Sequence, residues 1–494
     1  MDYGLIFLTL SPEFVLAVAA MAVMGLDLTV LKGTSRIYRM TAAAGVMAIG
    51  IFTAILLLQY YVKDASFPLG MLVQNPLNLL VKKVILFVAL TIGLLATEVR
   101  FTRNVGEYYA LLMLATIGMM LLVSTENLLL LFVALELTSL SLYVLAGYNE
   151  RSRESAEAGM KYFLFGGMSA AFLLFGFSYL YGLGGTLDLG SLGLALSAHA
   201  ADPLLSVALI LVVIGFGFKL AAVPFHFWAP DTYQGAPIAS TMLIGSASKV
   251  AGGYAFLKLL LIGFGAGGWS GSGETITGWA PLLALIAVLS MVFGNLAALA
   301  QTSVRRLLGY SAVAHAGYLL LGFFGSESDA YHSVVFYLTV YALTTVGAFG
   351  VIAAVQGKGR DLTLRDFAGF SRKSPEMALC LLVFILSLAG IPPLAGFAGK
   401  FYLFAAALKS DPGHMGMLAA VSIGVVMSAV SLYYYLQLLK QVFVADPIGP
   451  VLRVKAGFLG RSMILLLAFC VITLGCAPGI FLDLITGAVI SVSR

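Results

Sequence analysis

Residues 215–231 read GFGFKLAAVPFHFWAPD, an apolar run that contains Lys219 five residues before Pro224. A proline removes one hydrogen bond of a helix and frees a carbonyl group about one turn earlier. In a lipid bilayer such freed groups are tolerated where protein buries them or where they line a cavity. The stretch therefore predicts a helix that crosses a membrane, breaks on the way and carries a charged side chain beside the break.

A second stretch has the same character. Residues 388–404 read LAGIPPLAGFAGKFYLF, in which Pro392 and Pro393 stand about two helical turns before Lys400. Discontinuous helices at corresponding positions of two halves of a chain are the best indication that a sequence gives of a transport site. The chain is therefore expected to consist of two related halves.

The composition predicts an all-α membrane protein. Of 494 residues 61% are hydrophobic and only 10% are charged, whereas a soluble domain carries about 25% charged residues. The apolar runs have the length of roughly 20 residues that a membrane-spanning helix needs. About fourteen spans are expected, near 5–31, 40–62, 77–97, 107–123, 127–148, 158–183, 203–227, 236–262, 278–300, 303–324, 331–356, 375–408, 415–443 and 461–485.

The two broken spans are the seventh and the twelfth. Because they are an odd number of spans apart, two five-helix units built around them have opposite orientations, which is the pattern of an inverted repeat. We expect helices 1–3 in residues 1–106, a first repeat of helices 4–8 in 107–265, an inverted second repeat of helices 9–13 in 278–444, and helix 14 in 461–494.

Basic residues are concentrated in alternate connections. If the N-terminus is outside, the inside connections hold most of them, including Lys32, Arg36, Arg39, Arg151, Arg153, Arg305, Arg306, Arg365, Arg372, Lys373 and Lys440. The outside connections hold few, among them Lys82, Lys83 and Lys409. This bias predicts that both termini lie outside. The net charge of +5 reflects this topology and gives no indication of nucleic-acid binding.

Four ionisable residues lie deep in apolar segments: Glu136, Lys219, Lys249 and Lys400. A charge near the centre of a bilayer costs about 2.5–3.5 kcal/mol on insertion scales. Of the 23 carboxylates, only Glu136 is expected in the middle of a span. Glu136 either forms a buried hydrogen bond between helices or belongs to a proton or ion site. The presence of three lysines in other apolar segments favours a proton or ion site.

Lysine and carboxylate side chains suit proton transfer. A lysine in a low-dielectric site has a lowered pKa, which a nearby carboxylate raises again. Movement of the carboxylate can therefore switch the amine between holding and releasing a proton. His315, in the span that corresponds to that of Glu136, is either a packing residue or a relay in the same chain.

Other polar residues near span ends leave two interpretations open. Lys161 either extends to the interface or joins the relay, and His226 either caps the broken helix or lines an entrance, as does Asp231. Lys258, near the outer end of span eight, is expected to extend to the interface. Asp27 is expected at the inner interface.

Sites for redox or ATP chemistry are not indicated. The three cysteines, Cys380, Cys470 and Cys476, lie in apolar segments without the spacing of a haem, iron–sulfur or zinc site. We find no phosphate-binding lysine loop, catalytic triad or metal cluster. The energy for transport is therefore expected from an ion gradient or from a partner.

A family resemblance appears in residues 224–252, PFHFWAPDTYQGAPIASTMLIGSASKVAG. This segment resembles the proton-conducting antiporter-like family that respiratory complex I shares with Mrp-type antiporters. The segments LLLLFVALELTSLSLYVLAGY (128–148), EAGMKYFLFG (157–166) and GIPPLAGFAGKFYLF (390–404) resemble it too. The resemblance implies that Glu136 pairs with Lys219, that Lys249 is the central relay and that Lys400 is the terminal one.

The resemblance also implies partners. The chain belongs, on this view, to an NADH:quinone oxidoreductase in a bacterial inner membrane, beside an M-type antiporter-like subunit and the small membrane subunits near the quinone. NADH, FMN, iron–sulfur clusters and quinone are then bound by partner subunits and none by this chain. The alternatives are a cation/proton antiporter subunit of the Mrp type and a membrane-arm subunit that does not pump.

Overall fold

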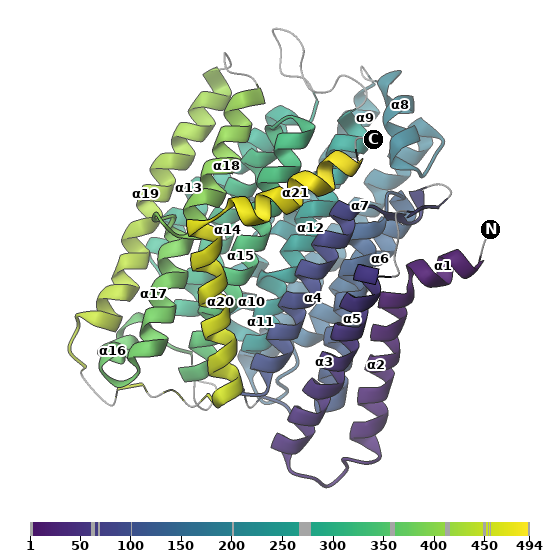
Figure 1. Ribbon diagram of the computed structural model, residues 1–494. Helices are drawn as coiled ribbons and strands as arrows, with labels where there is room; N and C mark the ends of the chain where they lie inside the picture. The colour runs from purple at the N-terminus through teal and green to yellow at the C-terminus, as the bar shows by residue number, and fades with distance from the viewer. Residues whose placement is uncertain are drawn as a thin grey trace.

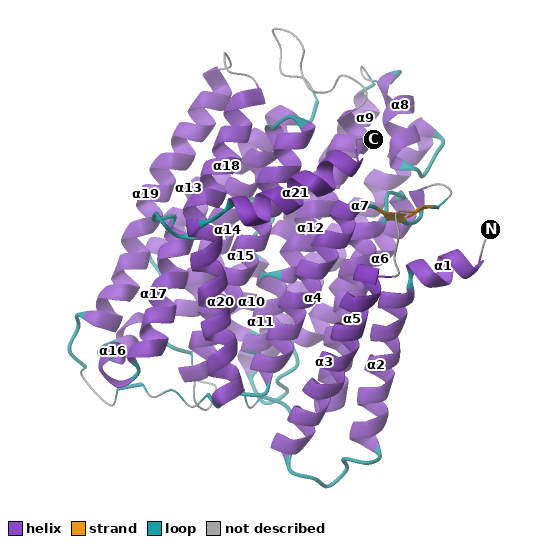
Figure 2. Ribbon diagram, in the orientation of Figure 1, coloured by secondary structure: helices purple, strands orange, loops and turns teal. Residues whose placement is uncertain are grey.

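The computed structural model shows a bundle of long helices that lie side by side (Figure 1). It describes residues 3–60, 65–67, 70–99, 101–199, 202–265, 278–355, 361–410, 415–447, 451–452, 454 and 456–492. Figure 2 shows that helix dominates this part of the chain and that one short strand pair accompanies it. The predicted all-α class is confirmed.

The first half of the chain contains α1 Tyr3–Thr9, α2 Ser11–Leu28, α3 Arg36–Tyr60, α4 Pro76–Ala96, α5 Val105–Ser124, α6 Leu128–Ala146, α7 Arg153–Gly184, α8 Leu189–Ser197, α9 Pro203–Leu220, α10 Trp228–Gly235, α11 Ile238–Gly245, α12 Ala247–Lys258 and the π-helix η2 Leu259–Phe264. The second half contains α13 Ala280–Leu299, α14 Val304–Leu321, η4 Gly322–Phe324, α15 Glu327–Val355, η5 Leu364–Phe367, α16 Phe370–Lys373, α17 Pro375–Ala389, α18 Ala395–Ser410, α19 Met415–Phe443, α20 Phe458–Cys476 and α21 Gly479–Val492.

Within the described residues, 13 helices are long and apolar enough to cross a membrane. The pair α17 and α18 forms a further, broken span, so the chain is the polytopic membrane protein of about fourteen spans that the sequence predicts. At the centre of the bundle α15 is buried along its length, and it packs against α12, α17 and α18.

Local sequence fixes where several helices begin. The side chain of Asn127 accepts hydrogen bonds from the backbone N–H groups of Leu129 and Leu130, which caps α6. Pro203 stands in the first turn of α9, where its missing N–H is not needed. Such caps place the ends of the spans that carry the buried charges.

Two backbone bridges occupy corresponding places. Asn127, which precedes α6, pairs with Asp188, and Ser303, which precedes α14, pairs with Thr363. In each case the residue before a span pairs with the long connection that follows the next span. A separate two-stranded ribbon, β1 Ala65–Ser66 and β2 Val73–Gln74, lies before α4.

Three spans that the sequence presents as continuous are divided. The first consists of α1 and α2, and the eighth is interrupted at Ser246, between α11 and α12. In the last span, predicted for 461–485, the helix ends at Cys476 and Pro478 interrupts it. The following helix α21 lies obliquely across α15 and α4 (Figure 1).

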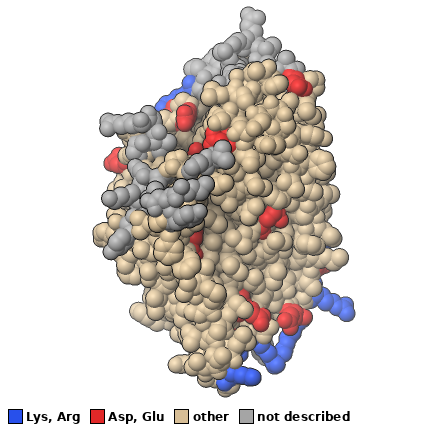
Figure 3. Space-filling model, turned by 90° about the vertical axis from the view of Figure 1, so that its right-hand side faces the viewer, with Lys and Arg blue, Asp and Glu red and all other residues tan. Residues whose placement is uncertain are grey.

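The outer surface is suited to lipid. Figure 3 shows a face that is mostly uncharged, with isolated acidic side chains at several heights and most of the visible lysine and arginine at its lower end. Large apolar side chains such as Met21, Phe52 and Phe175 are more than half exposed. An apolar exterior of this extent requires a membrane around it.

Candidate functional site

The first helix break lies directly after Lys219. Ala221 has a left-handed backbone, with φ of 62°, and ends α9; a cis bond joins Val223 to Pro224. The indole Nε1 of Trp228 donates a hydrogen bond of 3.0 Å to the carbonyl of Phe218, which also accepts one from the backbone N–H of Ala221. Lys219 is therefore held in the last turn of α9, almost completely buried.

At the second break a buried lysine side chain binds the freed carbonyl group. Gly390, with φ of 86°, ends α17, and a cis bond joins Pro392 to Pro393. The carbonyl that the break frees, that of Ala389, accepts a hydrogen bond of 3.0 Å from Lys400 Nζ. The sequence predicts a freed carbonyl one turn before the prolines, and here the buried lysine itself binds it.

The two breaks share one register. In both breaks the second residue of the cis bond comes three positions after the left-handed residue, Pro224 after Ala221 and Pro393 after Gly390. Ten residues after the left-handed residue stand Asp231 in the first break and Lys400 in the second. Thus Lys219 precedes its break, Lys400 follows its own, and Asp231 occupies the position that corresponds to Lys400.

Glu136 and Lys219 are close without touching. Lys219 Nζ donates a hydrogen bond of 3.3 Å to Ser139 Oγ, one turn along α6 from Glu136. The half-buried Glu136 interacts electrostatically with Lys219, and its buried Oε1 has no hydrogen-bond partner among the described residues. A carboxylate oxygen without a partner beside a loosely bound ammonium is an arrangement in which a small movement can make or break an ion pair.

Lys249 follows the unexpected break in span eight. It is the third residue of α12, and its Nζ donates a hydrogen bond of 2.9 Å to the carbonyl of Ala312 and lies 5.5 Å from the centre of the Tyr341 ring. One turn further, Gly252 lies against Lys219, because a Cβ there would stand 2.8 Å from Lys219 Cγ. The glycine lets the two lysine-bearing helices approach closely.

His315 lies between Lys249 and Lys400. Its Nδ1 is 2.6 Å from Tyr337 Oη and its Nε2 is 3.4 Å from Tyr435 Oη. A cavity with room for about one water molecule is lined by Lys249, His315, Tyr337 and other residues. The imidazole therefore has hydroxyl partners on both nitrogens, as a relay needs and as a packing residue does not require.

Lys400 completes the series. Besides the carbonyl of Ala389 it binds Ser428 Oγ at 2.8 Å, and it lies 4.7 Å from the centre of the Tyr318 ring. Both Lys249 and Lys400 act electrostatically on His315. The structure thus brings Glu136 near Lys219, and His315 near both Lys249 and Lys400, while Gly252 holds α12 against Lys219.

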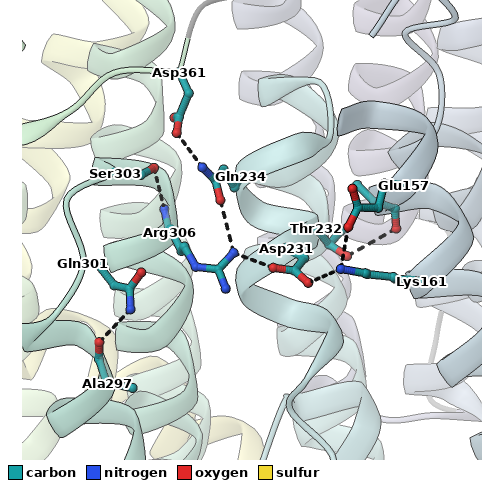
Figure 4. Close-up of polar contacts among 11 residues, drawn as sticks. Glu157, Lys161, Asp231, Thr232, Gln234, Ala297, Gln301, Ser303, Arg306 and Asp361 are labelled. Carbon is teal, nitrogen blue, oxygen red and sulfur yellow. Dashed lines mark hydrogen bonds and ion pairs between the residues drawn. The ribbon is translucent and has the colours of Figure 1, made fainter. Parts of the chain in front are cut away.

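Lys161 and Asp231 belong to a separate cluster of polar side chains (Figure 4). Lys161 forms 2.6 Å ion pairs with both Glu157 and Asp231, and Asp231 also pairs with Arg306. Gln234 extends the cluster from Arg306 to Asp361. Lys161 is bound by carboxylates here, and the cluster joins α7 and α10 to α14.

His226 lies between the halves of the first broken span. It is 3% exposed, its ring centre is 4.8 Å from that of Phe293, and its Nδ1 has no hydrogen-bond partner within the described residues. Its role as a cap or as part of an entrance stays a prediction.

We expect the substitution Asp231→Asn to destabilise the protein clearly more than Glu157→Gln. Asp231 serves two cations, and hydrogen bonds to charged groups contribute about 1.5–3 kcal/mol, whereas exposed ion pairs such as that of Glu157 contribute about 0–1 kcal/mol. Thermal unfolding in detergent measures the difference. Equal effects of the two substitutions would contradict the inference that Asp231, which binds two cations, contributes more to stability than Glu157.

Three cations are buried although the sequence does not predict it. Lys82, expected in an outer connection, is 0% exposed within α4. Lys258, expected to extend to the interface, is 2% exposed, and Arg305 binds the backbone carbonyls of Tyr233 and Ala236. Glu13 is a further buried carboxylate. The position of Lys82 and Lys258 within their helices' apolar runs was the available signal.

Asp27, expected at the inner interface, lies one residue before the end of α2. It is 5% exposed, and its carboxylate binds Arg39 and the backbone N–H of Gly106. The ion pair with Arg39 allows the carboxylate to be buried at the end of α2.

These features define a class: a polytopic helical membrane protein with two matched broken spans and a series of buried ionisable groups between them. The family described as "NADH:quinone oxidoreductase/Mrp antiporter, TM" matches residues 125–428. The chain belongs to this family.

Individual relatives agree over nearly the whole chain. The chain is 46% identical to "NADH-quinone oxidoreductase subunit N 2" of Acidobacterium capsulatum, over 95% of this chain and 96% of the relative. It resembles a chain of respiratory complex I from Thermus thermophilus with bound Aureothin, with 34% identity, a TM-score of 0.79 and coverage of 96% and 98%. A chain of the Mrp complex from Dietzia sp. shares the fold, with 23% identity, a TM-score of 0.79 and coverage of 99% and 97%.

Proposed function

We propose that this chain is the N-type, proton-translocating membrane-arm subunit of a bacterial NADH:quinone oxidoreductase. The observation that carries the proposal is the set of ionisable groups inside the bundle, with Glu136 near Lys219 and His315 near both Lys249 and Lys400. Its partners are an M-type antiporter-like subunit and the small membrane subunits near the quinone. The redox cofactors NADH, FMN, iron–sulfur clusters and quinone are bound by partners, so that the chain takes part in the enzyme without a redox centre of its own.

The comparisons favour this proposal over an Mrp-type antiporter. Relatives named as NADH-quinone oxidoreductase subunit N are 46% identical to this chain in one case and 36% identical over 97% of the chain in another. The Mrp chain, at 23% identity, supports the shared fold alone.

The geometry suits proton transfer through lysines. An ammonium that lies in a buried site with few hydrogen-bond partners releases its proton more readily when a nearby carboxylate moves away or is neutralised. In this chain Lys219 carries such an ammonium and Glu136 is the nearby carboxylate. The proposed path continues from Lys219 through Lys249 and His315, which line one cavity with room for about one water molecule, to Lys400.

We also propose the two inverted repeats, 107–265 and 278–444, between N-terminal helices in 1–106 and a C-terminal helix in 461–494. The first two and the last two residues of the chain lie outside the described residues. The shared register of the breaks and the corresponding bridges at Asn127 and Ser303 support this division. The concentration of positive charge at one end of the bundle supports both termini on the periplasmic side.

The test is the whole complex reconstituted in vesicles with Lys219→Ala or Glu136→Ala in this chain. Proton relays contribute on the order of 10²-fold or more to the step that they serve, so we expect a lower proton-to-electron ratio in a complex that still assembles. The exposed residues Lys32 and Glu150 provide the controls Lys32→Gln and Glu150→Gln. Unchanged assembly and an unchanged ratio in both test variants would favour a subunit that does not pump.

A further inference from the structure

Two buried ion pairs lie at the end of the bundle where α2 begins and α12 ends, away from the series described above. Lys82 of α4 binds Glu13 of α2, with 2.6 Å between Nζ and Oε1. Lys258 of α12 binds Glu126, in the connection between α5 and α6, at 3.0 Å. Lys82 and Lys258 repel each other electrostatically, so the two pairs are close neighbours.

The pair of Lys258 is fully coordinated. Its ammonium has a hydrogen-bond partner for each of its three N–H groups: the carbonyls of Val123 and Thr125 and the carboxylate of Glu126. Two of these partners are carbonyls at the end of α5, where a cation is favoured by the helix dipole. Lys258 is thus a fixed positive charge that stabilises the end of a helix.

The pair of Glu13 and Lys82 is not fully coordinated. The structure gives Lys82 Nζ one partner among the described residues, Glu13 Oε1, and the buried Glu13 Oε2 has none. A buried ion pair that only braces two helices needs its remaining donors and acceptors satisfied, because its desolvation is costly. The free donors and the free carboxylate oxygen are instead the partners that an ordered water or a transferred proton uses.

Polar groups lead from this pair toward the strand ribbon. Asn78, one turn before Lys82, accepts a hydrogen bond of 2.7 Å from Tyr254 Oη. Gln74, in β2, is 1% exposed, and both atoms of its side-chain amide lack partners in the described part of the chain. Next to Lys258 the helix changes to the π-form in η2, which is frequent at functional sites.

We propose that Glu13 and Lys82 form a second proton-exchange site, which takes a proton and water as its ligands and is reached past Gln74 and Asn78. The site rests on the proposed function of the chain. In the exchange the N–H bond of the Lys82 ammonium breaks and an O–H bond forms on Glu13, which leaves a neutral amine and a neutral carboxylic acid.

Two double variants separate a proton site from a brace. Glu13→Gln with Lys82→Gln keeps a hydrogen-bonded pair without any group that exchanges protons. Glu13→Lys with Lys82→Glu keeps both charges and exchanges their places. Lys83→Gln, which changes the neighbouring lysine that binds Gln59, is the matched control.

In the whole complex in vesicles we expect the amide pair to lower the proton-to-electron ratio, the exchanged pair to restore it and Lys83→Gln to leave it unchanged. We also expect a carboxylic-acid C=O band in the infrared difference spectrum on turnover, shifted by Glu13→Asp and absent from the amide pair. A normal ratio in the amide pair would overturn the proposal. If that variant does not assemble, the band decides: a spectrum that Glu13→Asp leaves unchanged overturns it.

Lys219→Ala measured in parallel distinguishes a failure of the second proton-exchange site from a failure of the proposed function. A low ratio in Lys219→Ala together with a normal ratio in the amide pair would overturn the second site alone. Normal ratios in both would overturn the proposed function as well.

Discussion

Replacing Lys400 by methionine is expected to stop proton transfer at the end of the series while the bundle still assembles. Lys400 Nζ is held by the carbonyl of Ala389 and by Ser428 Oγ, and methionine can neither hold nor release a proton there. Assembly should survive because Ser428 Oγ still donates to the carbonyl of Ala389, at 3.3 Å. Removal of a buried charge also removes its desolvation cost.

The measurement is proton uptake per NADH oxidised by the whole complex in vesicles. We expect the loss to be on the order of 10²-fold or more for the step that Lys400 serves. Lys409→Gln is the matched control, since Lys409 lies on the same helix α18 and is exposed. Full proton uptake in the Lys400→Met complex would remove Lys400 from the path.

The largest structural effect is expected for Gly396→Ala, which should prevent stable assembly. A Cβ at Gly396 would stand 1.8 Å from the backbone oxygen of Ser387, and the backbone there cannot move without shifting the end of α17. The N–H of Gly396 also donates to Ser387 Oγ at 3.1 Å. Overpacking of this kind destabilises a protein by roughly 1–3 kcal/mol and sometimes more. Because the added Cβ would meet backbone and not a flexible side chain, we expect a loss of stability at the upper end of this range.

The yield of folded protein and its thermal unfolding in detergent test this expectation. Gly167→Ala is the matched control, because a Cβ there has no atom of another part of the protein within 4 Å. Alanine in place of such a helical glycine is neutral or stabilises by about 0.4–1 kcal/mol. Equal stability of the two variants would show that α17 and α18 are not packed as described.

The sequence predicts the helix breaks well because proline acts locally. Pro224 and the pair Pro392 and Pro393 remove hydrogen bonds whatever surrounds them, and both spans break within a few residues of them. The break at Ser246 has a weaker signal, a Gly-Ser pair, which is a common place for a kink but is compatible with a straight helix. Lys249 therefore lies at a helix start that the sequence does not reveal.

Burial of the other charges depends on neighbouring helices. Lys82 and Lys258 lie near helix ends, where a long side chain usually reaches water. Here α2 brings Glu13 to Lys82, and the end of α5 brings its carbonyls to Lys258. Hydrophobicity along one helix contains no information on such partners, since they come from segments distant in sequence. The same reason explains why the carboxylate partner of Lys161 on α10, Asp231, was not foreseen.

The common register of the two breaks has an electrical consequence. The backbone repeats the same turn at Ala221 and at Gly390, yet ten residues later one copy carries an acid, Asp231, and the other a base, Lys400. In the first copy the acid is neutralised by the cations Lys161 and Arg306, whereas in the second the ammonium of Lys400 is bound by a carbonyl and a hydroxyl group. The duplicated scaffold therefore holds a balanced charge at one matched point and a positive charge among neutral partners at the other, so its two halves are electrically inequivalent even where the backbone is alike.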